Sequence, residues 1–227
     1  MESIVNRILI IGASSGIGAA IAEKLAAEGH SLVLHGRDEE RLGEVRDRLK
    51  PAQVELLLGD VTDWAEDPRS IPAIEPVDAI IWSAGICELA AGQMLSLKAV
   101  RRTLSINLEA PLVVLSHFYR KRVIKDGGTI VLLGSSSAHE AGEGFSVYAA
   151  SKGGLASAAR VLDKEFSPST GSGQGRGVRV RCIEPGTVNT PMTQRLVAQF
   201  GGLKGGHMES MVEPETVAAE VVRLLGA

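Results

Sequence analysis

The sequence of 227 residues has few aromatic residues, few cysteines and little net charge. Aromatic side chains make up 4%, and the two cysteines, Cys87 and Cys182, cannot form a disulfide framework. We interpret both as small core residues in a reducing compartment. The 24 Lys and Arg residues nearly balance the 27 Asp and Glu residues, which leaves a net charge of −3. This balance gives no electrostatic reason to bind nucleic acid or an anionic membrane.

Long apolar runs are missing as well. No stretch approaches the roughly 20 apolar residues that span a bilayer. The first residues, 1–4, lack the basic and then apolar pattern of a signal peptide. We therefore expect a cytoplasmic protein with no membrane partner. We also expect no metal site, because the histidines are too scattered to offer ligand spacing; they are His30, His35, His117, His139 and His207.

Short apolar runs alternate with helical patterns along the chain. Helical patterns span residues 17–27 and 38–50, for example. Continuous apolar strands are typical of a parallel sheet that is covered on both faces. We predict a single α/β domain, residues 1–227, with a doubly wound parallel sheet. The predicted strands span 4–11, 31–35, 54–58, 79–82, 129–133 and 178–183.

Two polar segments predict loops. Three prolines prevent a long helix over residues 63–76, so we expect at most one helical turn there. Residues 167–177, with the sequence SPSTGSGQGRG, predict a flexible surface loop. This loop is also compatible with a domain boundary. One domain is the simpler interpretation, because only about 50 residues follow the loop and they include a strand.

Glycine is abundant, and part of it gathers in one turn, residues 12–18 (GASSGIG), between the first strand and the first helix. At such a turn Gly12 permits the tight bend, and Gly18 lets the helix pack closely on the strand. Backbone N–H groups between them approach a pyrophosphate at the positive end of the helix. The turn therefore predicts a dinucleotide site, with contacts from Gly12, Ser14, Ser15, Gly16, Ile17 and Gly18.

The spacing G-x-x-x-G-x-G, followed later by a Y-x-x-x-K pattern, resembles the short-chain dehydrogenase/reductase family. The family's fingerprint begins with a threonine, which is Ile11 here, so a hydroxyl that helps to hold the turn is missing. The resemblance covers residues 5–225. It implies a Rossmann fold and an enzyme that transfers hydride between a nicotinamide cofactor and a carbonyl or alcohol substrate.

Tyr148 and Lys152 lie four residues apart, which places them on one face of a helix. A free tyrosine has a pKa of ~10, and a nearby ammonium lowers it. The resemblance adds Ser135, with Ser136 as the alternative, and Asn107. It implies that Tyr148 is the general acid and base, that Ser135 binds the substrate oxygen and that Lys152 holds the nicotinamide ribose. The Asn107 carbonyl would hold a water in a proton relay.

The second strand ends in His35-Gly36-Arg37-Asp38. Gly36 stands where NAD-preferring relatives place an acid, and Arg37 where NADP-preferring relatives place a base. A guanidinium can clamp a 2′-phosphate with two charge-assisted hydrogen bonds. We therefore predict NADP(H). In the alternative, Asp38 binds the ribose and NAD is preferred, although Asp38 is also a suitable N-cap for the next helix.

The resemblance implies further cofactor contacts after three other strands. Asp60 and Val61 would hold the adenine, with a plain helix cap as the alternative for Asp60. The pair Trp82-Ser83 replaces two asparagines of the family pattern, which removes their side-chain hydrogen bonds. The contacts implied at these turns are Asp60, Val61, Ser83, Ala84, Gly85, Pro185, Gly186, Val188 and Thr190.

Residues 192–211 are expected to form a substrate lid, whose glycines suit a closing motion. The lid has few charges, namely Arg195, Lys204 and Glu209, which disfavours a highly charged substrate. His139 and Glu140 follow the serine turn. We interpret them as surface loop residues, with a position facing the substrate as the alternative.

The last predicted helix begins near Pro214 and reaches the end of the chain. Relatives usually carry a seventh strand after it, so we expect six strands here. Relatives assemble through two long helices, near 97–125 and 147–166 in this chain, which implies a homodimer or homotetramer. Two alternatives to the reductase share the fold: a non-catalytic NADP-binding regulator, and an epimerase or dehydratase.

Overall fold

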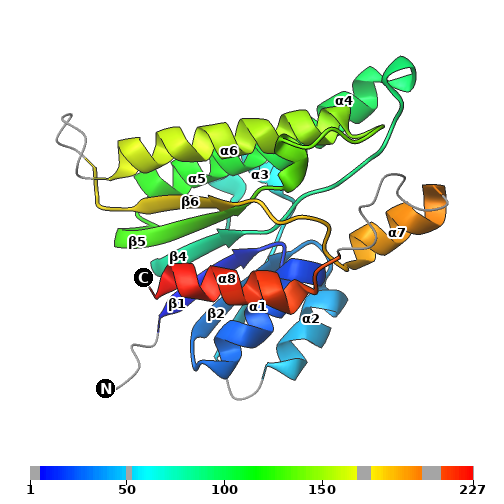
Figure 1. Ribbon diagram of the computed structural model, residues 1–227. Helices are drawn as coiled ribbons and strands as arrows, with labels where there is room; N and C mark the ends of the chain where they lie inside the picture. Colours follow the sequence, from blue (N-terminus) through cyan, green and yellow to red (C-terminus); the bar gives the residue numbers. More distant parts are fainter. Residues whose placement is uncertain (1–5, 50–52, 168–174, 201–210, 227) are drawn as a thin grey trace.

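The computed structural model describes residues 6–49, 53–167, 175–200 and 211–226 (Figure 1). Six strands form one sheet in the order β3-β2-β1-β4-β5-β6, and every neighbouring pair is parallel. The single α/β domain with a doubly wound six-stranded sheet is therefore confirmed. The strands are β1 (Arg7–Ile11), β2 (Ser31–Gly36), β3 (Val54–Leu58), β4 (Val77–Trp82), β5 (Ile124–Leu133) and β6 (Arg179–Ile183).

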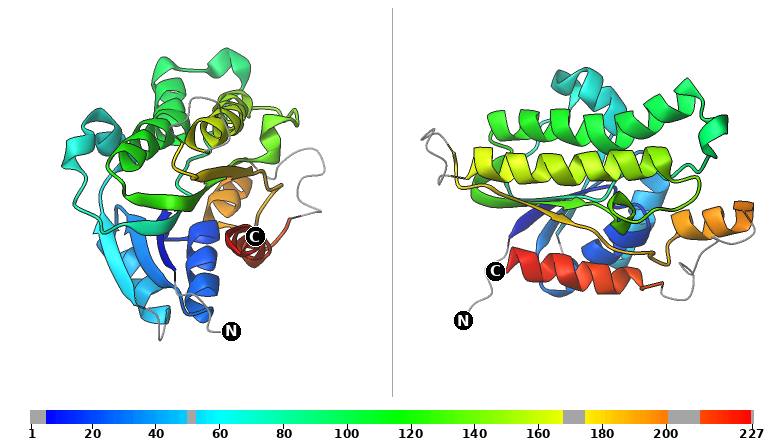
Figure 2. Two further views of the ribbon diagram at one scale, coloured as in Figure 1. Left: turned by 90° about the vertical axis from the view of Figure 1, so that its left-hand side faces the viewer. Right: turned by 45° about the horizontal axis from the view of Figure 1, so that its top comes forward.

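Helices cover both faces of the sheet (Figures 1 and 2). One face carries α1 (Gly16–Ala27), α2 (Glu39–Arg48) and α8 (Pro214–Leu225). The other carries α3 (Val61–Glu66), α5 (Ala110–Arg120) and α6 (Ser146–Phe166), and α4 (Leu97–Leu104) leads into α5 through a π-helical turn, η3 (Ser105–Glu109). Helix α7 (Pro191–Phe200) lies beyond the carboxyl ends of the strands. Short 3-10 turns are η1 (Pro68–Ser70), η2 (Gly92–Met94) and η4 (Ser136–Ala138).

The side chains of β1 show why the strands have continuous apolar sequences. Ile8 and Ile10 are buried against α1, α2 and α8, whereas Leu9 and Ile11 are buried in the second core on the opposite face. Successive strand residues point to opposite faces, so a sheet covered on both sides needs an apolar residue at every position.

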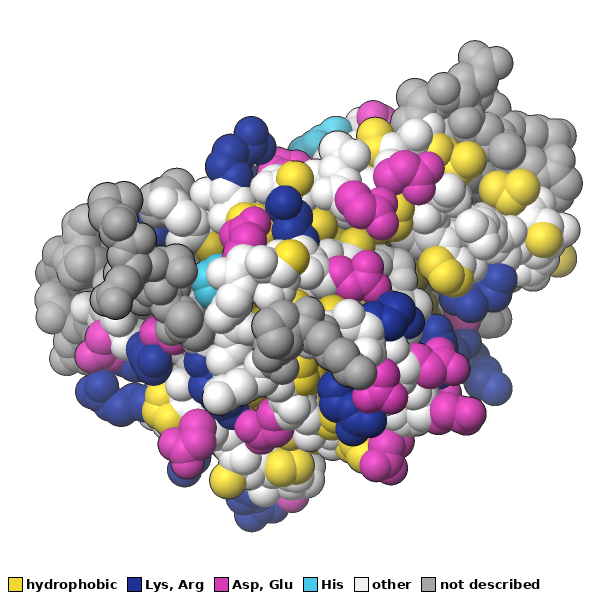
Figure 3. Space-filling view, turned by 90° about the horizontal axis from the view of Figure 1, so that it is seen from below, with side chains coloured by type: hydrophobic (Ala, Val, Ile, Leu, Met, Phe, Trp, Pro, Cys, Tyr) yellow, Lys and Arg dark blue, Asp and Glu magenta, His cyan; other side chains and the backbone are white. Residues whose placement is uncertain are grey.

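The charged helix α2 begins after Asp38, whose carboxylate accepts a hydrogen bond from the Arg41 N–H at 3.1 Å. Glu23 of α1 pairs with Arg48 of α2 at 3.0 Å. The face seen from below carries acidic and basic side chains side by side (Figure 3). Asp38 thus acts as the N-cap that its position after β2 predicts.

Some element boundaries differ from the predicted ones. The helical segment that begins at Leu97 ends at Arg120, not near 125, because Arg122 takes a left-handed conformation with φ 59° and β5 begins at Ile124. Strand β5 therefore starts five residues before the predicted 129–133 run. The proline-rich segment 63–76 holds the end of α3 and the turn η1, slightly more helix than the single turn expected.

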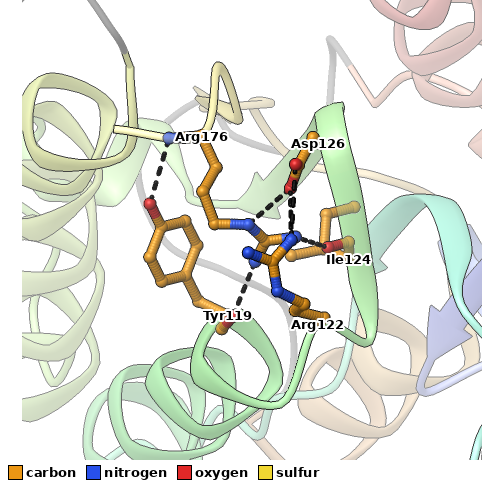
Figure 4. A network of polar contacts seen from close by, with 5 residues as sticks. All are labelled: Tyr119, Arg122, Ile124, Asp126 and Arg176. Atoms are coloured by element: carbon orange, nitrogen blue, oxygen red, sulfur yellow. Dashed lines mark hydrogen bonds and ion pairs between the residues drawn. The ribbon is translucent and has the colours of Figure 1, made fainter. Parts of the chain in front are cut away.

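A network of polar contacts lies at the edge of the sheet where the strands begin (Figure 4). Most of the predicted loop 167–177 lies outside the described residues. Arg176, near the end of this loop, forms hydrogen bonds with three other residues. Its guanidinium donates to Asp126 at 2.5 Å, to the Tyr119 carbonyl at 2.6 Å and to the Ile124 carbonyl at 2.7 Å. The Tyr119 ring stacks on Phe166, with ring centroids 3.9 Å apart. These contacts join α5, β5 and α6 at the edge opposite the site described next.

Candidate active site

A large cleft of about 510 Å³ runs along the carboxyl ends of the strands. Neighbours β1 and β4 are followed by connections to opposite faces of the sheet, and ligands of doubly wound folds bind where this reversal occurs. Most of the predicted cofactor residues line this cleft: Gly12, Ser14, Ser15, Gly16, Ile17, Arg37, Asp60, Val61, Ser83, Ala84, Gly85, Tyr148, Lys152 and Thr190.

The glycine turn is packed so tightly that side chains do not fit. Gly12 has a φ of +87°, and a Cβ added to it would lie 2.6 Å from the backbone nitrogen of Ala84. A Cβ at Gly18, which does not line the cleft, would overlap the Gly12 carbonyl oxygen. The turn therefore brings bare backbone to the cleft wall, packed directly against the backbone of Ala84.

No side chain caps the amino-terminal end of α1. Ser15 occupies the N-cap position, yet its side chain makes no capping hydrogen bond, and the first turn of α1 has no acidic residue. Free N–H groups and the helix dipole at such a terminus favour an anion. Together with the bare glycine turn, these features fit the pyrophosphate of a dinucleotide.

Helix α6 presents Tyr148 and Lys152 to the cleft, with the Lys152 Nζ atom 5.8 Å from the centre of the Tyr148 ring. Lys152 is buried, and its Nζ atom donates to the Leu133 carbonyl at 2.7 Å. Ser135 follows β5 and lines the small pocket together with Tyr148, close enough to lower the pKa of the phenol. The Ser135 Oγ atom accepts from the Ser137 N–H at 3.2 Å, which leaves the Ser135 proton available to a substrate oxygen.

Burial controls the titration of both groups. It raises the pKa of Tyr148 to about 12, the nearby Cys87 thiol adds to this, and the Ser135 side chain opposes it. Burial also lowers the pKa of Lys152 to about 8. The lowered Tyr148 pKa expected from the lysine is therefore wrong for this structure, because desolvation of the phenolate outweighs its neighbours. Tyr148 is protonated at neutral pH and suited to donate a proton.

Asn107 lies in the π-helical turn η3 and is 1% exposed. Its side-chain oxygen accepts from the Ile86 N–H at 2.8 Å, and its side-chain nitrogen donates to the Ile86 carbonyl at 2.8 Å and to Ser151 Oγ at 3.1 Å. A Cβ on Gly85 would lie 3.2 Å from Asn107 Oδ1 and 3.4 Å from Lys152 Nζ. Asn107 thus ties the turn after β4 to α6 beside Lys152, a contact that the sequence pattern did not predict.

At the far end of the large cleft, Arg37 donates to Asp60 at 2.8 Å. The other Asp60 oxygen accepts from the Thr62 N–H at 2.9 Å, so Asp60 is also the N-cap of α3. Burial alone would raise the pKa of Asp60, but the hydrogen bonds from Thr62 and Arg37 lower it. Arg41 lines the cleft as well. Sequence reasoning missed Arg41, although its place in the first turn of α2 was a usable signal.

A small pocket of about 130 Å³ adjoins the large cleft, and Tyr148 lines both. Pro185, Gly186 and Val188 of the loop after β6 line only the small pocket, whereas Thr190 lines both. The loop is held by a bridge between Val188 and Val212. From the predicted lid, Met192, Thr193 and Leu196 of α7 reach the small pocket; residues 201–210 lie outside the described residues.

Cys87 lies in a place that the sequence did not predict, whereas His139 and Glu140 are exposed loop residues as predicted. Cys87 is half-buried and lines both cavities, so it is not a plain core residue; burial raises its pKa to about 12. Cys182 is also half-buried. Glu140 is exposed, yet it lines the small pocket, whereas His139 pairs with Glu184 at 3.2 Å. Within the described residues, no group of three or more His, Cys, Asp or Glu side chains is arranged to hold a metal ion.

The family model for short chain dehydrogenases matches residues 6–200. The chain belongs to this family. A relative in Staphylococcus saprophyticus, described as an uncharacterised oxidoreductase, is 33% identical over 192 residues, which cover 82% of this chain and 79% of the relative. Galactitol 2-dehydrogenase (L-tagatose-forming) of Cereibacter sphaeroides is 32% identical over 192 residues, covering 82% of this chain and 73% of that enzyme.

A solved short chain dehydrogenase from Burkholderia cenocepacia, in complex with NADP, superposes with a TM-score of 0.77 at 25% identity. The match covers 97% of this chain and 90% of that one. This chain is thus an oxidoreductase of the short-chain dehydrogenase family. No helix among its described residues is long and apolar enough to cross a membrane.

Proposed function

We propose that this short-chain dehydrogenase interconverts a carbonyl compound and an alcohol with NADP(H), and that Tyr148 is its general acid and base. One observation carries the proposal: Tyr148 stands where the large cleft and the small pocket meet, with Ser135 and Lys152 beside it. A long cleft joined to a small pocket suits a dinucleotide and a small substrate that meet at one reacting atom.

The protein groups supply the proton and the polar environment. A bound nicotinamide cofactor supplies or accepts the hydride. During reduction the Tyr148 hydroxyl donates its proton to the substrate oxygen, and the Ser135 hydroxyl donates a hydrogen bond to the same oxygen. Lys152 holds the nicotinamide ribose and places positive charge near Tyr148. The Asn107 backbone carbonyl holds a water of the proton relay that returns a proton to Tyr148 after the reaction. Oxidation of an alcohol runs these steps in reverse.

The residues that would hold the cofactor line the large cleft and, at the nicotinamide end, the small pocket. Residues 12–18 and the start of α1 bind the pyrophosphate, and Asp60 with Val61 holds the adenine. The turn after β4, at Ser83, Ala84 and Gly85, would hold the adenine ribose. The loop after β6, at Pro185, Gly186, Val188 and Thr190, would hold the carboxamide.

Arg37 and Arg41 favour NADP(H) over NAD(H). Both line the large cleft, and Arg37 meets Asp60 through Nη1 alone, so its other N–H groups are free to bind a 2′-phosphate. The Asp38 carboxylate is engaged as the α2 cap, which argues against a role on the ribose. The solved relative that contains NADP supports the same choice.

We propose that the enzyme assembles as a homodimer or homotetramer through α4, α5 and α6. Val113 on α5 and Val161 on α6 support this, because both are large apolar side chains that stand 39% and 54% exposed. We also propose a cytoplasmic location, in keeping with the two free cysteines.

The proposal is tested by following NADPH and NADH consumption with a panel of ketones, aldehydes, quinones and acyl thioesters. We expect turnover of at least one class, faster with NADPH than with NADH at subsaturating cofactor. Tight cofactor binding without turnover of any class would instead indicate the non-catalytic regulator. Each assay is repeated on the reverse reaction with the corresponding alcohols.

A further inference from the structure

The charges of the two adjoining cavities differ in sign. The large cleft is lined by Arg37, Arg41, Arg102, Lys152 and Arg195, with acidic partners at only two positions. Among the described residues that line the small pocket, by contrast, Glu140 is the one charged side chain. A negative group in the substrate pocket repels anions at close range, since like charges brought together cost free energy.

Glu140 is held beside the reacting groups. Its N–H donates to the Ser136 carbonyl at 3.0 Å, and its Oε2 atom accepts from Ser136 Oγ at 3.0 Å. Ser136 directly follows Ser135, so the carboxylate folds back over the serine turn. The neighbouring His139 pairs with Glu184, and no basic side chain of the described residues forms an ion pair with Glu140. One carboxylate oxygen therefore remains available as a hydrogen-bond acceptor.

The other pocket walls combine hydroxyl groups with apolar surface. Ser137 and Thr187 line the pocket, and within the described part of the chain neither hydroxyl has a hydrogen-bond partner. Phe145, Met192 and Leu196 supply apolar surface in the same pocket. Hydroxyl groups donate and accept, so they match substrate hydroxyls better than a cation, which only donates. The apolar walls match a short carbon chain.

We infer that the substrate is a small uncharged hydroxy ketone, or the corresponding polyol, whose hydroxyl group donates a hydrogen bond to Glu140. Glu140 is then the residue that selects against carboxylate and phosphate substrates. This inference rests on the proposed function and narrows its substrate class.

Two ketones of the same chain length test the inference: 4-hydroxy-2-butanone, which is neutral and carries a hydroxyl, and acetoacetate, which carries a carboxylate at the same position. Their dissociation constants are measured by calorimetry on protein saturated with NADP⁺, which has no hydride to transfer to either ketone group. Their kcat and KM are measured separately with NADPH. We expect the wild type to prefer the hydroxy ketone by about tenfold or more in both Kd and kcat/KM.

The variant Glu140→Gln keeps the size of the side chain and removes its charge. We expect it to reduce the preference by about three- to tenfold, because Kd and KM fall for acetoacetate and rise for the hydroxy ketone, which loses its charged hydrogen-bond acceptor. The matched control is Glu143→Gln, an exposed acid of the same loop that does not line the pocket. It should leave the preference unchanged.

Different results would contradict the substrate inference and the proposed carbonyl reduction. Equal or stronger binding of acetoacetate by the wild type, or an unchanged preference in Glu140→Gln, overturns the inference even if ketones are turned over. A binding preference that depends on Glu140 without turnover of any ketone supports the inference and contradicts the proposed reaction.

Discussion

The Nζ atom of Lys152 donates a hydrogen bond to the backbone carbonyl of Leu133 at 2.7 Å. Leu133 is the last residue of β5, and the catalytic candidate Ser135 follows two residues later. This bond therefore fixes α6 against the end of β5 and sets Tyr148 opposite Ser135. It also gives the buried Lys152 ammonium a hydrogen-bond partner. Among the described residues, no carboxylate forms an ion pair with Lys152.

Tyr148→Phe should reduce kcat/KM by ~100-fold or more, because it removes the general acid while keeping the ring in place. The other tyrosine of the chain offers a control: Tyr119 belongs to the network at the opposite edge of the sheet, so Tyr119→Phe should keep kcat/KM within about threefold. Steady-state kinetics on both variants decide the point. Wild-type activity in Tyr148→Phe would contradict the assignment.

The titration of Lys152 should appear in the stability of the protein. Its folded pKa, about 8, is lowered by burial from 10.5, so the unfolded chain binds the proton more tightly between these values. The free energy of unfolding should therefore rise as pH increases from about 8 to 10, by up to about 3 kcal/mol. Urea unfolding at several pH values measures this. In Lys152→Met the same contribution should be absent, and an identical pH dependence in both proteins would rule it out.

Arg37→Ala should weaken NADPH binding by about tenfold or more, since it removes a charge-assisted hydrogen bond to the 2′-phosphate. NADH, which lacks that phosphate, should lose less than about threefold. Fluorescence titration with both cofactors gives the four constants. Asp38→Asn is the matched control, because asparagine also caps a helix, and it should leave the NADPH constant unchanged. Tighter binding of NADH than of NADPH by the wild type would contradict the NADP preference.

Gly18→Ala should destabilise the fold by about 1–3 kcal/mol and weaken cofactor binding, because the new methyl group overlaps the Gly12 carbonyl and displaces the turn. Gly43→Ala in α2 is the opposite case. Its Cβ would come no closer than 3.8 Å to another side chain, so alanine should stabilise that helix by up to about 1 kcal/mol. Thermal unfolding of the two variants, with and without NADPH, compares them directly.

Local features of the sequence were enough to predict much of the site. The glycine turn after β1 and the four-residue spacing of Tyr148 and Lys152 depend only on neighbours in the chain, because turn geometry and helix periodicity are local. The apolar runs predicted the parallel sheet for a similar reason: strands buried on both faces need apolar residues throughout. Asp38 was identified as a cap from its position alone.

Other properties depended on segments that are distant in the sequence. The Arg37 to Asp60 ion pair joins the ends of β2 and β3, and Asn107 meets Ile86 and Ser151 across three elements. The direction of the Tyr148 pKa shift is the sharpest example. The spacing to Lys152 predicts a lowered pKa, whereas the packed site raises it, because burial depends on the whole assembly of helices around the sheet. The sequence alone thus determined which chemical groups are present, and the tertiary structure decided their solvation and therefore how they titrate.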